Sequence, residues 1–373
     1  MRQRNSNFIA LHALVKAGLW ETDIQLSKYG EIDFSEVLKM AQEQSVVGLV
    51  AAGIEHVVDV KIPKEIVFQF VGITMQLENR NNAMNRFIAW LLVKFREEGI
   101  NACVVKGQGV AQCYNRPLWR MCGDVDLLLD EENYEKAKVY MSSFAEVEEE
   151  EVEYRKHIAY KIDQWTVELH GNFRCGFLKR VDYVLDNVHK DVLVRNHIRI
   201  WNDENVHIQL PAPTNDVVFV FTHILQHFFI EGVGLRQLCD WCKLIGRYYD
   251  EIDQKVLENW IRQMGLMTEW RAFAALAVDY LGMPNVMIPF YSDDNKWKRK
   301  AESIMSFVMK TGNFGRNRDT SYAHKYPYIV VKAISLLRHS KDTVRFIRIF
   351  PFDAIKLYFE LLITRSKVVM LGK

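Results

Sequence analysis

Residues 104–129 read VVKGQGVAQCYNRPLWRMCGDVDLLL, a segment in which two apolar runs enclose a glycine-rich turn. The runs at residues 101–105 and 124–129 are short, apolar and bounded, a pattern typical of buried strands. Between them the pattern predicts a turn at Lys106 and Gly107, followed by a helix over residues 109–114. We therefore predict a unit made of a strand, a turn, a short helix, a loop and a second strand.

Two aspartates, Asp124 and Asp126, stand at the start of the second predicted strand. Side chains two apart on a strand project from the same face, roughly 6–7 Å apart, so both can bind one metal ion or a pair. Burying two like charges without a cation is costly, and carboxylate oxygens suit Mg²⁺. A solvated strand start is the alternative interpretation. The apolar run at residues 127–129 argues against it, because it places the acids at the end of a buried strand.

A third acid, Glu168, follows in a segment that predicts a β-hairpin over residues 157–170 with its turn at residues 163–164. Apolar residues alternate along both arms, which puts Glu168 on the face opposite its apolar neighbours. If that face also carries Asp124 and Asp126, the three acids can hold two Mg²⁺ ions about 3.5–4 Å apart. An exposed strand acid is the alternative for Glu168.

These motifs, together with Arg120 and the Lys106-Gly107 turn, resemble the polymerase-beta-type nucleotidyltransferase superfamily. The resemblance is narrower to a bacterial branch of uncharacterised nucleotidyltransferase family proteins, in which Lys-Gly replaces the Gly-Gly or Gly-Ser of other members. It covers about residues 98–246. It implies an α+β fold, with a small mixed β-sheet nucleotidyltransferase core flanked by N-terminal and C-terminal helical regions.

The resemblance also implies a Mg²⁺-dependent enzyme that moves a nucleoside monophosphate from a nucleoside triphosphate to a hydroxyl-bearing acceptor. The acceptor stays open among small molecules, sugars, lipids and proteins, and Mn²⁺ is the alternative cofactor. The implied catalytic residues and metal ligands are Asp124, Asp126 and Glu168. The implied nucleotide-binding residues are Lys106, Gly107, Gln108 and Arg120. Free N–H groups where a turn enters a helix also favour phosphate at this turn.

Four more side chains are candidates to line the substrate side of the site. His170 lies two residues after Glu168 and so shares its strand face. His223 lies on a predicted helix, and a second helix carrying Arg236 and Asp240 follows it. The alternative is a structural role for these residues, including an Arg236–Asp240 pair within one helix.

Three regions divide the chain in this interpretation: N-terminal helices over residues 1–97, the core over residues 98–210, and a C-terminal helical domain with a basic tail over residues 211–373. A helical pattern covers residues 64–98. We predict a break in it near residues 78–82, because the polar sequence ENRNN interrupts the apolar spacing.

Charge and cysteine content limit the partners and the compartment. The 48 Lys and Arg residues balance 47 Asp and Glu residues, so nothing favours a broad nucleic-acid surface. Six cysteines in 373 residues suggest reduced thiols and a cytoplasmic protein. Cys239 and Cys242 form a lone CxxC, which we interpret as two core residues, with a zinc site as the alternative.

The C-terminal tail, residues 321–373, is basic and rich in aromatic residues, with ten Lys or Arg and three acids. We interpret it as closing helices with a basic outer face, and the alternative is peripheral contact with an anionic membrane. No apolar run is long enough to predict a membrane-spanning helix.

Two other functions compete with nucleotidyl transfer. The first is a glycosyltransferase whose Asp-x-Asp binds a nucleotide-sugar through Mn²⁺. Such an enzyme needs a parallel nucleotide-binding sheet before the motif, whereas the sequence there is mostly helical. The second is a non-catalytic nucleotide-binding or scaffold protein on the same core. The three acids of the predicted metal site argue against it.

Overall fold

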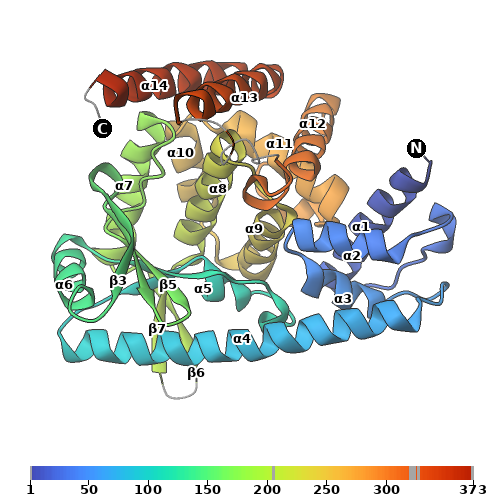
Figure 1. Ribbon diagram of the computed structural model, residues 1–373, viewed down its shortest axis with the longest axis horizontal. Coiled ribbons are helices and arrows are strands. Elements are labelled where there is room, and N and C mark those ends of the chain that lie inside the picture. The colour runs from blue at the N-terminus through green and yellow to red at the C-terminus, as the bar shows by residue number, and fades with distance from the viewer. Residues whose placement is uncertain (1, 204–205, 319–324, 326–327, 371–373) are drawn as a thin grey trace.

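A mixed five-stranded sheet in the order β1-β2-β5-β4-β3 lies at one end of the molecule (Figure 1). The computed structural model describes residues 2–203, 206–318, 325 and 328–370. β2 runs parallel to β5, and the other neighbouring strands are antiparallel. The strands are β1 (Cys103–Val105), β2 (Asp124–Leu128), β3 (Glu146–Val152), β4 (His157–Ile162) and β5 (Trp165–His170). With helices around this sheet, the fold is α+β, as predicted.

The two faces of the sheet differ in polarity. Val125 of β2 and Val167 of β5 are buried in an apolar cluster that includes residues of α4 (Lys64–Glu97) and Tyr134 of α6 (Glu131–Met141). Because strand side chains alternate, the acidic residues between these apolar ones project from the opposite face. One apolar face therefore anchors the sheet, and the other is free to carry polar chemistry.

The predicted hairpin is confirmed. β4 and β5 pair in continuous register from His157 opposite His170 to Ile162 opposite Trp165, with the turn at residues 163–164. The helix after β1 differs from the prediction, because α5 spans Gly107–Ala111. It starts two residues early because the chain already reverses direction at Lys106, whose φ is 54°.

Helix α4 is continuous, so the predicted break near residues 78–82 is wrong. Asn81 within this segment is fully buried, and its side-chain amide donates to the carbonyl oxygens of Leu118 at 2.7 Å and Arg120 at 2.8 Å. Its Oδ1 accepts a hydrogen bond from Gln108 Nε2 at 2.9 Å. The polar residue breaks the apolar pattern but not the helix, because tertiary partners satisfy it.

The N-terminal helices pack over the other half of α4 (Figure 1). They are α1 (Arg2–Trp20), α2 (Phe34–Glu43) and α3 (Val47–Glu55). α1 and α3 approach so closely that a Cβ on Gly18 would lie 1.9 Å from the carbonyl oxygen of Leu49. Lys16 and Trp20 of α1 also donate to carbonyl oxygens of α11 (Met267–Leu281), which joins the N-terminal helices to the C-terminal ones.

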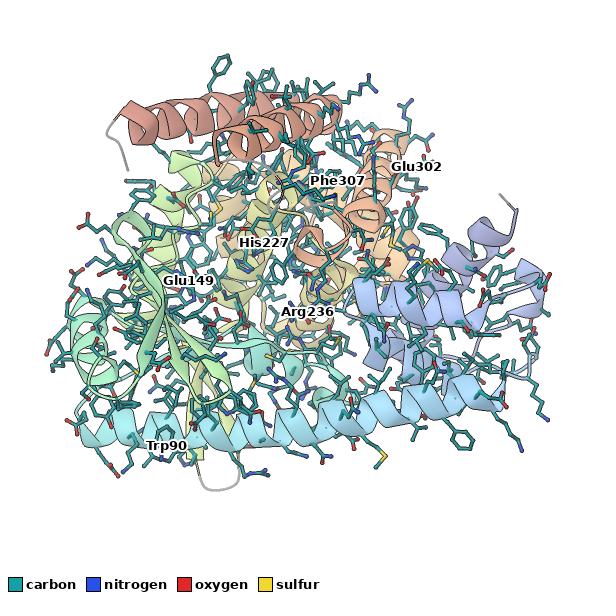
Figure 2. All side chains as sticks on the ribbon, in the orientation of Figure 1. Trp90, Glu149, His227, Arg236, Glu302 and Phe307 are labelled. Atoms are coloured by element: carbon teal, nitrogen blue, oxygen red, sulfur yellow. The ribbon has the colours of Figure 1, made fainter. Side chains whose placement is uncertain are left out.

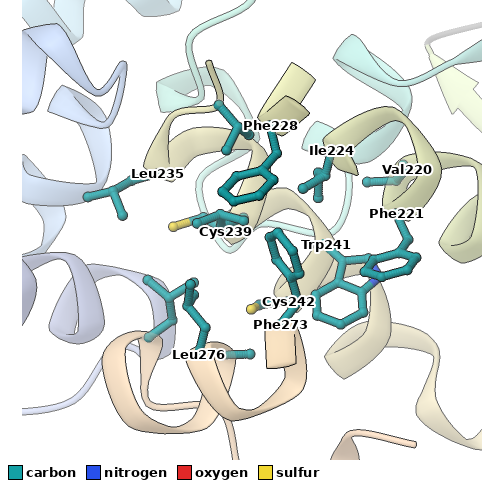
Figure 3. Close-up of a cluster of buried hydrophobic side chains, with 14 of the residues drawn as sticks. Val220, Phe221, Ile224, Phe228, Leu235, Cys239, Trp241, Cys242, Phe273 and Leu276 are labelled. Atoms are coloured by element: carbon teal, nitrogen blue, oxygen red, sulfur yellow. The ribbon is translucent and has the colours of Figure 1, made fainter. Parts of the chain in front are cut away.

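The C-terminal helices surround an aromatic core that includes Phe221, Trp241 and Phe273 (Figure 3). Cys239 and Cys242 lie buried in this core, and burial raises the pKa of both thiols. These surroundings support the interpretation of the CxxC as core residues. The helices here are α7 (Lys179–Leu193), α8 (Pro213–Ile230), α9 (Leu235–Tyr248), α10 (Gln254–Gln263), α11 and α12 (Asn295–Thr311). A hairpin of β6 (Ile198–Asp203) and β7 (Val206–Pro211) precedes α8.

Two closing helices, α13 (Tyr328–Ile349) and α14 (Pro351–Met370), lie across the far side of the C-terminal helices (Figure 1). Phe346 and Phe350 point into the core, whereas Phe352 is 88% exposed. The predicted basic tail also includes residues 321–324, 326–327 and 371–373, which lie outside the described residues. Within the described residues, no helix combines the length and apolarity needed to cross a membrane.

Candidate active site

The three acids singled out from the sequence come together on one face of the sheet. Asp126 is the direct cross-strand partner of Glu168, and Asp124 is the partner of Thr166. Residues two apart on a strand share a face, so Asp124, Asp126 and Glu168 project to the same side. Asp126 is only 3% exposed. Such a concentration of buried carboxylates requires nearby positive charge.

Lys106 supplies part of that charge. Its Nζ lies 2.6 Å from Asp126 Oδ1. Burial lowers the pKa of Lys106, but the carboxylates of Asp126, Glu168 and Asp124 outweigh burial and raise it, so the ammonium group stays charged. The backbone of Lys106 has φ 54° and ψ −143°, which is strained for a residue with a side chain. The fold therefore accepts local strain where this lysine meets the acids.

Two histidines hold the third acid. His157 Nε2 lies 3.1 Å from Glu168 Oε2, and His170 Nε2 lies 3.4 Å from the same oxygen. His170 Nε2 is also 2.9 Å from Asp126 Oδ1. Burial raises the pKa of Glu168, but hydrogen bonds from the two histidines outweigh burial and hold the pKa well below its usual value. Glu168 is therefore ionised in this environment.

Asp124 differs from the other two acids because, among the described residues, no hydrogen bond or ion pair engages its carboxylate. Burial, and then the charges of Asp126 and Glu168, raise its pKa to about 6. The raised pKa reflects burial first and repulsion by the two acids second, and the charges of Lys106 and Arg236 only partly offset these effects. A bound cation would relieve this repulsion.

Asp124 and Glu168 line a cleft between the sheet and α8 with an enclosed volume of about 270 Å³. A second, smaller pocket adjoins this cleft, and both are lined by Lys106, Asp124, His223 and Phe314. In Figure 2, Glu149 lies on the sheet, and His227 and Arg236 lie in the central part of the molecule between the sheet and the N-terminal helices. The enclosed volume of the cleft is close to the lower end of the range of small-molecule sites, about 300 Å³.

The α8 wall of the cleft carries a chain of hydrogen-bonded side chains. His227 Nδ1 lies 3.0 Å from Glu231 Oε2, and His227 Nε2 lies 3.0 Å from His223 Nε2. Burial, followed by the charge of Lys106, lowers the pKa of His223 well below its usual value. His223 is therefore an uncharged imidazole facing the acids across the cleft.

Arg120 and Asp240 form a buried ion pair that the sequence did not reveal. Arg120 Nε and Nη2 each lie 2.7 Å from an oxygen of Asp240, and Tyr114 donates to the same carboxylate at 2.7 Å. This pairing engages the guanidinium that was predicted to lie near a triphosphate, and Arg120 also lines the smaller pocket, so that role stays a prediction. The predicted pair within α9 is wrong, because Arg236 Nη1 donates to the carbonyl oxygen of Met121 at 2.9 Å.

Gln108 also requires a correction. Its side chain is 2% exposed and points toward α4, where Nε2 contacts Asn81 Oδ1 and Met84 Sδ. It therefore cannot reach a phosphate in the cleft. Of the predicted nucleotide-binding residues, Lys106, Gly107 and Arg120 line the smaller pocket, and Lys106 also lines the cleft.

Several cleft residues were not selected from the sequence. His157 had a usable signal, because the hairpin register places it opposite His170. For Glu231 the sequence signal was weak: it lies four residues after His227, a spacing that brings two side chains together on a helix. Phe314, from the turn at Asn313–Gly315, had none, because only tertiary packing brings that turn to the cleft.

Comparison with known proteins agrees with this geometry at the level of the family. The chain matches no curated protein and no solved structure. A family described as an uncharacterised nucleotidyltransferase matches residues 30–282, more than half of the 373 residues. This range contains the whole five-stranded sheet, α8 and α9, and so includes the three acids, Lys106 and His223 of the candidate site, but not Phe314. The chain therefore belongs to this family of nucleotidyltransferases.

Proposed function

We propose that this protein transfers a nucleoside monophosphate from a nucleoside triphosphate to a hydroxyl-bearing acceptor, with a divalent metal ion held by Asp124, Asp126 and Glu168. The observation that carries the proposal is the pairing of Asp126 with Glu168 across β2 and β5, with Asp124 on the same face. Membership of a nucleotidyltransferase family supports the reaction class.

The donor set fits a divalent cation. Three carboxylates share one face, and Asp124 is left without a partner among the described residues while its neighbours repel it. Carboxylate oxygens are the preferred ligands of Mg²⁺. When bound, such an ion supplies positive charge that stabilises the triphosphate and the leaving pyrophosphate.

Lys106 and Gly107 are suited to hold the phosphates. Lys106 lines the cleft with a charged ammonium group beside Asp126. At Gly107 the φ of 36° disfavours other residues, and an added Cβ would lie 3.3 Å from Cys122 Sγ. The glycine thus permits the tight turn into α5, whose first N–H groups lack partners within the helix.

Glu168 and His223 divide the remaining tasks. A carboxylate with a depressed pKa is ionised but weakly basic, so Glu168 suits binding and orientation. His223 also lines the cleft, but burial and the charge of Lys106 lower its pKa well below its usual value, so this weakly basic, uncharged imidazole suits hydrogen bonding to the substrate. Arg236 lines the smaller pocket, where it contributes positive charge to the substrate side.

Calorimetry of nucleotide binding tests the proposal. ATP, GTP, CTP and UTP are each titrated into the full chain with and without Mg²⁺, and into an Asp124→Asn/Asp126→Asn variant. The matched control is Asp250→Asn, because Asp250 is an exposed acid on a short turn remote in sequence from the site.

We expect one triphosphate to bind to the wild type and to the control only with Mg²⁺, and to lose most of its affinity for the double variant. Equal binding by the double variant would contradict the assigned metal site. If no triphosphate binds, nucleotide-sugars with Mn²⁺ are the next ligands, and binding of one would favour the glycosyltransferase instead. Binding without any transfer to hydroxyl compounds would favour the non-catalytic alternative.

A further inference from the structure

We propose that His157, Glu168 and His170 form a nitrogen-containing metal site that takes a late transition ion, such as Zn²⁺ or Co²⁺, in preference to Mg²⁺. This inference rests on the proposed function, because the nucleotidyl-transfer reaction proposed above gives the bound ion its role. It assigns two histidine ligands to the Glu168 side of the cleft, beside the oxygen ligands of Asp124 and Asp126.

The distances among the ligand atoms fit a single ion. His157 Nε2 and His170 Nε2 lie 3.1 and 3.4 Å from Glu168 Oε2, and the three ligand atoms all lie within 4.8 Å of one another. Ligands about 2.0–2.2 Å from a tetrahedral ion are roughly 3.4 Å apart. The three side chains can therefore bind an ion after only small movements.

The strands hold these residues in place before any ion binds. His157 and His170 are direct partners across the antiparallel pair β4–β5, and Glu168 lies two residues before His170 on the same face. Ligands carried on paired strands are held more rigidly than ligands on loops.

The ligand chemistry selects the class of ion. Mg²⁺ takes oxygen ligands and retains water, whereas imidazole favours zinc and its neighbours in the transition series. Two histidines and a glutamate also form a common zinc ligand set that leaves a position open. The three side chains line the open cleft and are 13–21% exposed, so an ion can enter from solvent.

The proton on His157 can move to make room for an ion. His157 Nδ1 is buried and has no hydrogen-bond partner, so only the contact of Nε2 with the Glu168 carboxylate holds the proton on Nε2. Nε2 can then change from a donor toward Glu168 to a metal ligand. Because metal-bound histidines usually donate through their other nitrogen, we expect His157 to be the weaker of the two histidine ligands.

Metal binding without nucleotide tests the proposal on the full chain. Metal-free protein is titrated with Zn²⁺ against a chromophoric chelator, and with Co²⁺ while its visible absorption is recorded. The variants are His157→Gln and His170→Gln. One control is His207→Gln, an exposed histidine, and the other is His227→Gln, which removes a histidine in the same cleft that is outside the proposed site.

We expect one equivalent of Zn²⁺ to bind, and His170→Gln to weaken it by roughly 100-fold, since removing a ligand costs at least as much as removing its hydrogen-bond partner. His157→Gln should weaken it less, and both controls should bind like the wild type. The proposal is overturned if both ligand variants bind Zn²⁺ as tightly as the wild type. It is also overturned if His227→Gln weakens Zn²⁺ binding. If His170→Gln does not fold, His157→Gln carries the test.

The outcome separates this inference from the proposed function. If nucleotide binds with Mg²⁺ but the Zn²⁺ affinity is unchanged when His157 and His170 are replaced, the inference fails and the proposed function stands. If Zn²⁺ affinity depends on both histidines but no triphosphate binds, the metal site stands and the assigned reaction fails.

Discussion

Asp126 and Glu168 lie directly opposite each other on the parallel strands β2 and β5, and each is held by a basic side chain. Lys106 contacts Asp126, and His157 contacts Glu168. Asp124, which shares their face, has no such partner among the described residues. The site is therefore built with more negative charge than its own cations balance, and this excess has consequences for stability as well as for binding.

Replacing Asp124 by Asn should stabilise the metal-free protein at pH 8. Burial and the charges of Asp126 and Glu168 disfavour the ionised Asp124 in the folded state. Removing that charge should raise the free energy of unfolding by about 3 kcal/mol, since the pKa of Asp124 rises to about 6 and one pKa unit corresponds to about 1.4 kcal/mol. Urea denaturation in the presence of a chelator measures the change. A less stable variant would mean that the carboxylate has a stabilising partner.

The ion pair of Arg120 and Asp240 should act on stability rather than on nucleotide affinity. Asp240→Leu leaves the buried guanidinium of Arg120 without its partner. We expect the free energy of unfolding to fall by about 3–5 kcal/mol. The double variant Arg120→Met/Asp240→Leu should recover much of that loss. Arg262→Met, which breaks an exposed pair with Glu258, is the control and should change stability by less than about 1 kcal/mol. Denaturant unfolding, combined with nucleotide titration, distinguishes this structural role from direct phosphate binding.

Asn81 should be intolerant of substitution although it lies in the middle of a helix. Asn81→Leu leaves the carbonyl oxygens of Leu118 and Arg120 without their donor. We expect the free energy of unfolding to fall by roughly 2–4 kcal/mol. Asn82 is exposed on the same helix, so Asn82→Ala should be neutral or slightly stabilising. Thermal unfolding of both variants provides the comparison. Equal effects at the two positions would rule out the proposed role of Asn81.

His12 should make the protein sensitive to mild acid. Its ring is buried between Phe8 and Tyr280, and burial, with the charge of Lys16, lowers its pKa to about 4. A lowered pKa means that the folded state resists protonation, so the stability contribution is complete above about pH 6.5 and is lost as the pH falls toward 4. The total loss should approach about 3 kcal/mol.

His12→Phe removes this titration and should flatten the dependence of the melting temperature on pH between 6.5 and 4. The control is His207→Gln, because His207 is exposed and should leave the wild-type slope unchanged. A slope that is the same in all three proteins would assign the acid sensitivity to other groups, among them His189, whose pKa burial also lowers to about 4.

Local patterns in the sequence were sufficient for the elements that carry the site. Alternation with a period of two in residues 157–170 predicted the hairpin, and the same rule put Glu168 on the face opposite its apolar neighbours. The spacing of Asp124 and Asp126 predicted a shared face in the same way. These inferences succeeded because strand alternation depends only on the backbone, and burial of one face makes it visible in the order of residues.

Local patterns failed where the outcome depended on a partner distant in the sequence. The polar residues near Asn81 predicted a break in α4, but carbonyl groups from the loop before β2 satisfy Asn81 and the helix continues. Arg120 was predicted to lie near a triphosphate, and Asp240 to line the site or pair with Arg236, whereas the fold pairs Arg120 with Asp240. No local rule reports which charges meet inside a folded core.

The sequence by itself therefore determined the strand unit, the faces on which the acids project and the likeness to nucleotidyltransferases. Only the tertiary structure decided what stands beside each acid: Lys106 at Asp126, His157 and His170 at Glu168, and no partner at Asp124 among the described residues. The physical reason is that backbone periodicity is a short-range property, whereas the pairing of buried charges is set by the packing of the whole chain.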